Sequence, residues 1–341
     1  MEELKKQAAK ITSLHVQGAT NIAIFAVKQM ALFAERNASL VPAELWEQIK
    51  KAEKILYYSR STEPAMKNGL AYIISRTKSA IDTEGFGKIN LFETIKRNSE
   101  EYINILNNCT QQIAKIGARR IPKGVEHFRV ITHCHSSVVE AILIEAHEQG
   151  KEFEVISTET RPLYQGRITA MNLHKAGIDV TQVVDSATRW VCKHKRIDMA
   201  IIGADAITSE GTVLNKIGSR LLALVAKENS IPFYVASQLL KYSQDTLFGN
   251  QEDIDMRKGE EIWSEICETA RGCKPSGIKI LNPAFESVSR FYINALITEA
   301  GIFPSGQAQM MFAEKYPGLQ KGFEIIEETQ VNGISQGYHC E

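Results

Sequence analysis

The sequence has no excess of charge of either sign. Its 341 residues include 40 Lys and Arg in total and 40 Asp and Glu in total, so the formal net charge at pH 7 is zero. Proteins that bind nucleic acid draw much of their affinity from basic side chains that neutralise phosphates. The balanced total therefore argues against a nucleic-acid partner.

Long apolar runs are also missing. Runs such as residues 22–27 and 199–202 are far shorter than the roughly 20 apolar residues that a helix needs to cross a bilayer. Residues 1–6 carry mixed charges and lead into no apolar stretch of about 7–15 residues, so we expect no signal peptide. We accordingly expect no membrane partner and a cytoplasmic protein.

Signatures of disulfide, metal and nucleotide sites are scarce. Six cysteines form no C-x-x-C pair and are too few for a disulfide scaffold, so we expect reduced thiols. His133 and His135 have no third ligand near them in the sequence, and no metal site is predicted. The chain has neither G-x-G-x-x-G nor G-x-x-x-x-G-K-[ST]. No cofactor is therefore expected.

The length corresponds to about two domains, and the first part of the chain has a helical pattern. Apolar residues recur at three- and four-residue spacing in residues 4–34, 45–58 and 92–116, which is typical of helices with one buried stripe. We predict an N-terminal helical domain over residues 1–117.

The second part has an α/β pattern in which short β-branched runs alternate with helical stretches. The runs are residues 130–133, 153–157, 180–184, 199–202 and 233–236. Their spacing, about 20 to 33 residues, fits a strand followed by a crossover helix, and such repeats predict a parallel sheet covered by helices. The fold class is therefore α/β, with a Rossmann-like parallel-sheet domain over residues 118–341.

Ligands of such sheets bind beyond the carboxyl ends of the strands, so we expect the functional residues among those that directly follow each strand. Cys134 follows the first predicted strand and precedes a helix that starts near Val138. The positive end of a helix dipole favours a thiolate, which makes Cys134 a candidate acid, base or nucleophile. The alternative is a small buried apolar residue.

The second predicted strand is followed by a candidate anion site. Arg161, Gln165 and Arg167 stand at the entry of the next helix, where a guanidinium and backbone N–H groups can hold a phosphate. Solvated surface arginines are the alternative.

The fourth predicted strand leads into Asp205, a candidate general acid or base, because a carboxylate at the end of an apolar strand is costly unless it is bonded or used. Asn215 and Lys216 then stand where we expect the next helix to begin, and Lys241 follows the fifth strand. A loop turn at Asp205 and a solvated Lys216 are the alternative. A thiol, a carboxylate and several anion-binding groups together indicate a small phosphorylated substrate.

Two positions stand out in the helical part. Gly18 interrupts a helical pattern, which suggests a break or a close backbone approach. Arg60, next to Ser61 and Thr62, is placed to close over a phosphate, although a surface position is the commoner fate of arginine.

Taken together, these motifs resemble the sugar-phosphate isomerases related to the alpha, beta and delta regulatory subunits of the eukaryotic guanine-nucleotide exchange factor of translation initiation. Within this family the chain is most similar to archaeal ribose-1,5-bisphosphate isomerases. The resemblance covers nearly the whole chain and is carried by residues 117–121, 132–136, 160–162, 165–166, 203–205, 215–218 and 282–285.

The resemblance implies an active site between the two domains and a homo-oligomer built on a dimer, of which a hexamer is one form. A nucleotide activator is left open. Cys134 and Asp205 match the family's catalytic pair. The implied substrate-binding residues are Gln17, Gly18, Ala19, Arg60, Ser136, Arg161, Gln165, Asn215, Lys216 and Lys241. Gln17 departs from the pattern, because the isomerases usually have arginine there.

The implied reaction converts ribose 1,5-bisphosphate to ribulose 1,5-bisphosphate by ring opening and proton transfer from C2 to C1. By analogy, Asp205 serves the ring oxygen and Cys134 the C2 proton, or the two roles are exchanged. Either assignment requires shifted pKa values: a thiol pKa lowered by the helix N-terminus and by cationic neighbours, and a carboxyl pKa raised by burial. The alternatives are methylthioribose-1-phosphate isomerase and a non-catalytic regulatory subunit that senses a nucleotide or a sugar phosphate.

Overall fold

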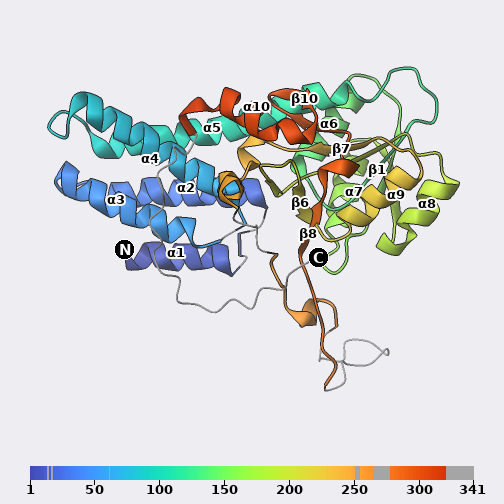
Figure 1. The fold of residues 1–341 in the computed structure, drawn as a ribbon, viewed down its shortest axis with the longest axis horizontal. Coiled ribbons are helices and arrows are strands. Elements are labelled where there is room, and N and C mark those ends of the chain that lie inside the picture. The colour runs from blue at the N-terminus through green and yellow to red at the C-terminus, as the bar shows by residue number, and fades with distance from the viewer. Residues whose placement is uncertain (14, 17, 61, 250–253, 264–276, 320–341) are drawn as a thin grey trace.

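The structure, a computed structural model, describes residues 1–319 except 14, 17, 61, 250–253 and 264–276. Five helices form the N-terminal part (Figure 1): α1 (Glu2–Thr12), α2 (Ala19–Arg36), α3 (Pro42–Tyr57), α4 (Pro64–Glu84) and α5 (Leu91–Ala118). Helices α3 and α4 each begin with proline, which suits the first helical position because proline has no N–H and an N–H there would lack an intrahelical partner.

The core of the helical part is mostly apolar. Tyr102 of α5 is fully buried, and its hydroxyl donates to the carbonyl of Ala65 in α4 at 2.6 Å. Gly69 lies against the Tyr102 ring, where a Cβ would come within 2.5 Å of it. The tyrosine therefore joins α4 and α5 by both packing and a hydrogen bond.

Seven strands of the described chain form the main sheet, in the order β10-β9-β7-β4-β1-β2-β3. Their bounds are β1 (Arg129–Thr132), β2 (Glu154–Thr158), β3 (Asp179–Val183), β4 (Met199–Ile202), β7 (Phe233–Ala236), β9 (Ala295–Thr298) and β10 (Gly301–Phe303). Neighbouring strands are parallel, except that β10 runs antiparallel to β9.

Helices cover both faces of this sheet (Figure 1). The helices are α6 (Ser137–Glu148), α7 (Gln165–Lys175), α8 (Thr188–His194), α9 (Ser219–Glu228) and α10 (Ala308–Lys315). Alternate strand residues enter different cores: Val130 packs in the core that includes α6, and Ile131 in the core that includes α9. Continuous apolar strands are expected in a sheet that is buried on both faces.

The predicted α/β fold class is confirmed, and all five predicted strands are present within one residue of their expected ends. The predicted break at Gly18 is also present, because α1 and α2 are separate helices.

One local prediction was wrong. Asn215 and Lys216 do not open a helix; they end strand β6 (Val213–Lys216), and α9 starts only at Ser219. Strand β6 belongs to a second sheet with β5 (Ala206–Ile207) and β8 (Phe285–Val288), in antiparallel pairs. The pattern did not predict this sheet, because its strands are short and their partner, β8, is about 70 residues away.

The long helix α5 connects the two parts (Figure 1). It packs along α6, where Gly117 lies so close to Ile142 that a Cβ would come within 2.5 Å of that side chain. The predicted domain boundary at residues 117/118 falls at the end of this helix and stays a prediction.

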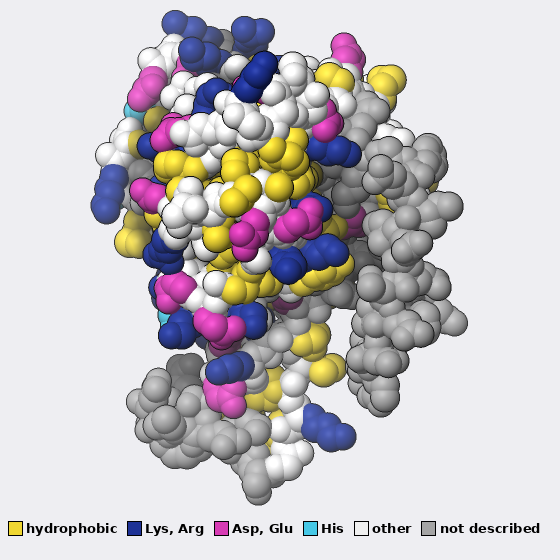
Figure 2. All heavy atoms as spheres, turned by 90° about the vertical axis from the view of Figure 1, so that its left-hand side faces the viewer, with side chains coloured by type: hydrophobic (Ala, Val, Ile, Leu, Met, Phe, Trp, Pro, Cys, Tyr) yellow, Lys and Arg dark blue, Asp and Glu magenta, His cyan; other side chains and the backbone are white. Residues whose placement is uncertain are grey.

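Charged side chains of both signs are interspersed on the end of the helical part, around a band of hydrophobic side chains (Figure 2). No helix within the described residues combines the length and the apolar character that a membrane crossing requires. The expectation of no nucleic-acid partner stays a prediction.

Replacing Tyr102 by alanine should destabilise the protein by about 3–5 kcal/mol, because it empties a buried ring site and removes a hydrogen bond. Urea unfolding measures this change. The matched control is Tyr58→Ala, since Tyr58 is 76% exposed and should cost less than about 1 kcal/mol. Equal losses for both variants would contradict the assigned core.

Candidate active site

The parallel pairing of β1 with β4 brings two candidate catalytic residues to one edge of the sheet. Ile131 of β1 is paired with Ala200 of β4, so the chain leaves both strands on the same side. Cys134 and Asp205 follow these two strands. The charge of Asp205 is close enough to raise the pKa of the Cys134 thiol.

Cys134 is held by the loop that follows β2. Its backbone N–H donates to Thr160 Oγ1 at 2.9 Å, and its carbonyl accepts from Thr169 Oγ1 at 3.2 Å. The thiol donates to Gln165 Oε1 at 3.6 Å. The backbone of Cys134 has φ +69°, which is uncommon for a residue with a side chain and typical of functional sites. The sulfur is therefore fixed by its neighbours.

The predicted lowering of the Cys134 pKa was wrong for the protein as it stands in the structure. Burial raises the pKa of this thiol to about 12, although the positive charge of Lys216 opposes the shift. A helix N-terminus cannot offset the loss of hydration when the sulfur is enclosed. The thiol consequently carries its proton at neutral pH.

His133, which follows β1, hydrogen-bonds to the end of β2 and to the segment before α9. The sequence analysis missed this role. One ring nitrogen bonds Thr158 Oγ1 at 2.6 Å, and the other bonds the carbonyl of Ile217 at 2.7 Å. Burial lowers the pKa of His133, which favours the neutral ring. Gly218 has φ +103° and lies against this ring, where a Cβ would come within 2.6 Å. The motif of His133 next to Cys134 was the available signal.

Asp185 organises the second loop and was also missed. Its carboxylate accepts from the backbone N–H groups of Thr160 at 2.8 Å and Arg161 at 2.7 Å. The Arg161 side chain stacks on Tyr164, with the guanidinium 5.1 Å from the ring centre, and bonds its hydroxyl. Gln165 begins helix α7. The predicted anion-site residues Arg161 and Gln165 thus lie in the loop that holds Cys134.

Ser136 follows β1 at this edge of the main sheet, and Lys216 ends strand β6 of the second sheet. Ser136 caps helix α6, accepting from Val139 N–H at 3.4 Å. Gly203 at the end of β4 lies against Ser136, and a Cβ there would come within 2.6 Å of the hydroxyl oxygen. Lys216 Nζ lies 4.6 Å from the ring centre of Phe285. A helix N-terminus and an ammonium group together suit an anion.

Asn215 is buried and donates to Ser219 Oγ at 2.8 Å, so in the structure it contacts the first residue of α9.

Several of the predicted residues line one small pocket. Its lining includes Arg161, Gln165 and Lys216.

The helical part reaches the same region through α2. Gly18 precedes this helix with φ +86°, and Ala19 is its first, buried residue. Thr20 donates to Gln238 Oε1, in the loop after β7, at 3.3 Å. Gln17 lies outside the described residues. The start of α2 is thus close to the strand ends, as the predicted roles of Gly18 and Ala19 require.

Lys241 and Arg60 lie near Asp205 but have protein partners. Lys241 Nζ donates to the carbonyl of Ala204 at 2.6 Å. Arg60 Nη2 donates to Asp255 at 2.8 Å, and its Nε lies 3.4 Å from Glu63. The charges of Arg60, Asp205 and Lys241 all act on the buried Glu63 carboxyl. The catalytic and binding roles of all these residues stay predictions.

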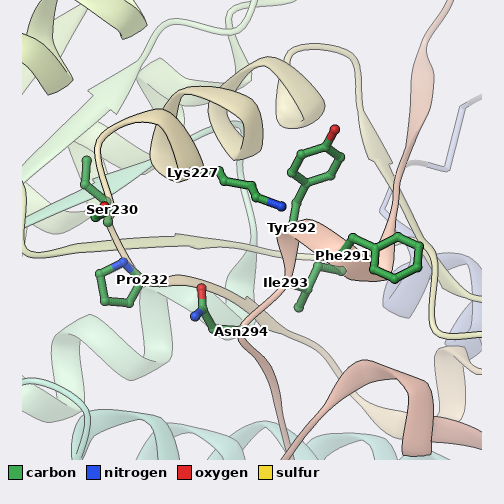
Figure 3. A pocket seen from close by; sticks show the side chains of 8 residues that line it. Lys227, Ser230, Pro232, Phe291, Tyr292, Ile293 and Asn294 are labelled. Atoms are coloured by element: carbon green, nitrogen blue, oxygen red, sulfur yellow. The ribbon is translucent and has the colours of Figure 1, made fainter.

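A pocket of about 250 Å³ lies at the opposite end of the sheet (Figure 3). It is lined by residues that precede β7 and β9, including Pro232 and Asn294, and Lys227 lies near the Tyr292 ring. Cys134 and Asp205 follow the other ends of parallel strands, so this pocket does not belong to the candidate site. Within the described residues, no group of three or more His, Cys, Asp or Glu is placed to hold a metal ion.

Comparison with known proteins decides the family. Residues 15–305 match the Initiation factor 2 subunit family. The chain belongs to this family. The predicted family relationship is thereby confirmed.

Named relatives of this family member include isomerases. It is 35% identical to a ribose 1,5-bisphosphate isomerase from Archaeoglobus fulgidus over 331 residues, which cover 97% of each chain. It is 32% identical to a methylthioribose-1-phosphate isomerase from Rhodopirellula baltica, over 86% of this chain and 83% of the relative. A crystal structure of the translation initiation factor eIF-2B from Pyrococcus horikoshii matches with a TM-score of 0.71 and 26% identity, over 89% of this chain and 98% of that one.

Alkylation of Cys134 should report its raised pKa. Because the thiolate is the reactive form, the rate with iodoacetamide should rise about tenfold per pH unit between roughly pH 7 and 9, well below the pKa of about 12. Peptide mass spectrometry separates Cys134 from the other cysteines. A rate that is already constant across this range would mean that the thiolate forms at neutral pH, against the burial effect.

Proposed function

We propose that this protein is an aldose–ketose isomerase that converts ribose 1,5-bisphosphate to ribulose 1,5-bisphosphate. The observation that carries the proposal is that a thiol and a carboxylate, Cys134 and Asp205, follow two neighbouring parallel strands at one edge of the sheet. Opening the ring and moving a proton from C2 to C1 calls for an acid at the ring oxygen and a base at C2.

Groups suited to phosphate lie in the same region of the protein. Arg161 and Lys216 supply positive charge, and the N-termini of α2 and α6 supply backbone N–H donors. Relatives named ribose 1,5-bisphosphate isomerase match at 35–36% identity over more than nine-tenths of the chain, which supports the bisphosphate as substrate.

The reaction returns every proton that it uses. An acid protonates the ring oxygen as the bond from C1 to that oxygen breaks, and a base removes the proton from C2 to give an enol that carries the 1-phosphate. The enol hydroxyl then loses its proton as the C2 ketone forms, and C1 gains one. Two groups that exchange protons with the substrate therefore suffice.

Two assignments of these roles satisfy the balance, with Cys134 or Asp205 as the acid at the ring oxygen. Burial keeps the Cys134 thiol protonated at neutral pH, since its pKa is about 12. The structure thus favours Cys134 as the initial proton donor and Asp205 as the base at C2. The remaining polar residues would orient the sugar and its phosphates. The homo-oligomer and the nucleotide activator stay predictions.

Activity assays with three substrates test the function. Purified protein should form ketose from ribose 1,5-bisphosphate faster than from ribose 1-phosphate or methylthioribose 1-phosphate. Cys134→Ser and Asp205→Asn should each lower kcat/KM by at least about 100-fold, as removal of a general acid or base does. Cys192→Ala, which removes another buried thiol from helix α8, is the matched control and should retain activity.

Turnover that survives both site substitutions would reject the assigned site. Preference for methylthioribose 1-phosphate would reassign the substrate. No turnover with any of the three, together with tight binding to an initiation-factor subunit, would favour the regulatory function instead.

A further inference from the structure

Glu63 is a buried carboxyl group to which the reaction above gives no role. It immediately precedes helix α4, and only 2% of its surface is exposed. Its Oε1 atom lies 3.4 Å from Arg60 Nε. Its Oε2 atom is buried and, within the described part of the protein, has no hydrogen-bond partner.

The Arg60–Glu63 pair contributes little to the stability of the fold. Arg60 Nε is also buried without a hydrogen-bond partner among the described residues, so the two groups attract each other without a well-formed bond. A guanidinium and a carboxyl group that are buried together without a well-formed hydrogen bond scarcely repay the loss of their hydration. Unsatisfied buried polar groups and shifted pKa values are typical of functional sites.

Arg60 is held from two sides by carboxyl groups. Glu63 lies beside its Nε, and Asp255 accepts from its Nη2 at 2.8 Å. No residue of the described chain bonds the Nη1 group, which is the part of the guanidinium that can still bind an anion. The guanidinium is planar, so two fixed nitrogens define where the third one points.

Charged groups from four segments act on Glu63. They are Arg60 on its own segment, Asp205 after β4, Lys241 after β7 and Asp255 before the turn at 259–261. Burial is the largest effect and raises the pKa of Glu63 to about 8. The carboxyl group is therefore mostly uncharged at pH 7 and mostly ionised at pH 9.

We propose that Glu63 is a positioning residue for Arg60, and that its charge sets how strongly Arg60 holds a phosphate of the substrate. This inference rests on the function proposed above. An uncharged Glu63 orients the guanidinium and leaves its positive charge available, whereas an ionised Glu63 adds a negative charge close to the bound phosphate.

Steady-state kinetics of three proteins at pH 7 and pH 9 test this inference. In the wild-type protein, KM for ribose 1,5-bisphosphate should rise about three- to tenfold from pH 7 to pH 9, because Glu63 ionises and repels the phosphate. Glu63→Gln keeps an oxygen beside Arg60 but cannot ionise, so its KM should match the wild type at pH 7 and stay constant. Glu63→Ala should raise KM about tenfold at both pH values, with a smaller change in kcat.

Glu154→Gln is the matched control. Glu154 is a half-buried carboxylate that pairs with Arg129 at 2.7 Å at the start of β2, the opposite end of the sheet, and its loss should leave the pH dependence of KM as in the wild type. Thermal unfolding of each variant checks folding, and Glu63→Gln alone decides the question if Glu63→Ala does not fold.

The outcomes separate the inference from the proposed function. A KM of Glu63→Gln that rises with pH as in the wild type overturns the inference alone, as does a wild-type KM that is constant. Wild-type protein that shows no turnover of ribose 1,5-bisphosphate overturns both.

Discussion

The parallel pairing of β1 with β4 is the constraint on which the rest of the site depends. It fixes where two loops leave the sheet, and thereby brings together residues about 70 positions apart in the sequence. Strands buried on both faces cannot slip in register without exposing apolar residues and losing backbone hydrogen bonds. The position of Cys134 relative to Asp205 is thus determined by the core.

The loops are then fixed by side chains that do not themselves carry the proposed chemistry. His133 joins β1, β2 and the approach to α9 through two hydrogen bonds, and Asp185 holds the backbone of the loop after β2. Such bonds keep the buried residue Cys134 in its uncommon backbone conformation. Burial is costly for ionisable groups, and the shifted pKa values of Cys134 and Glu63 express that cost.

The sequence predicted the parts of this arrangement that follow from local periodicity. Five of the six parallel strands in the described chain and the break at Gly18 were predicted, because alternating β-branched runs and a helix-breaking glycine are local signals, whereas β9 was missed. The small sheet that contains Lys216 was not, since it depends on pairing with a distant strand. Nor could the partners of Arg60 be predicted, because Asp255 is brought to it only by the fold. The thiol pKa was wrong because enclosure is a property of tertiary structure.

The most direct test of the account is a crystal structure of the Cys134→Ser variant with ribulose 1,5-bisphosphate bound. C1 and C2 of the sugar should lie between the side chains of residues 134 and 205, within about 4 Å of both, as proton transfer requires. A sugar bound elsewhere, for example in the pocket beside Lys227, or one that contacts neither side chain, would contradict it.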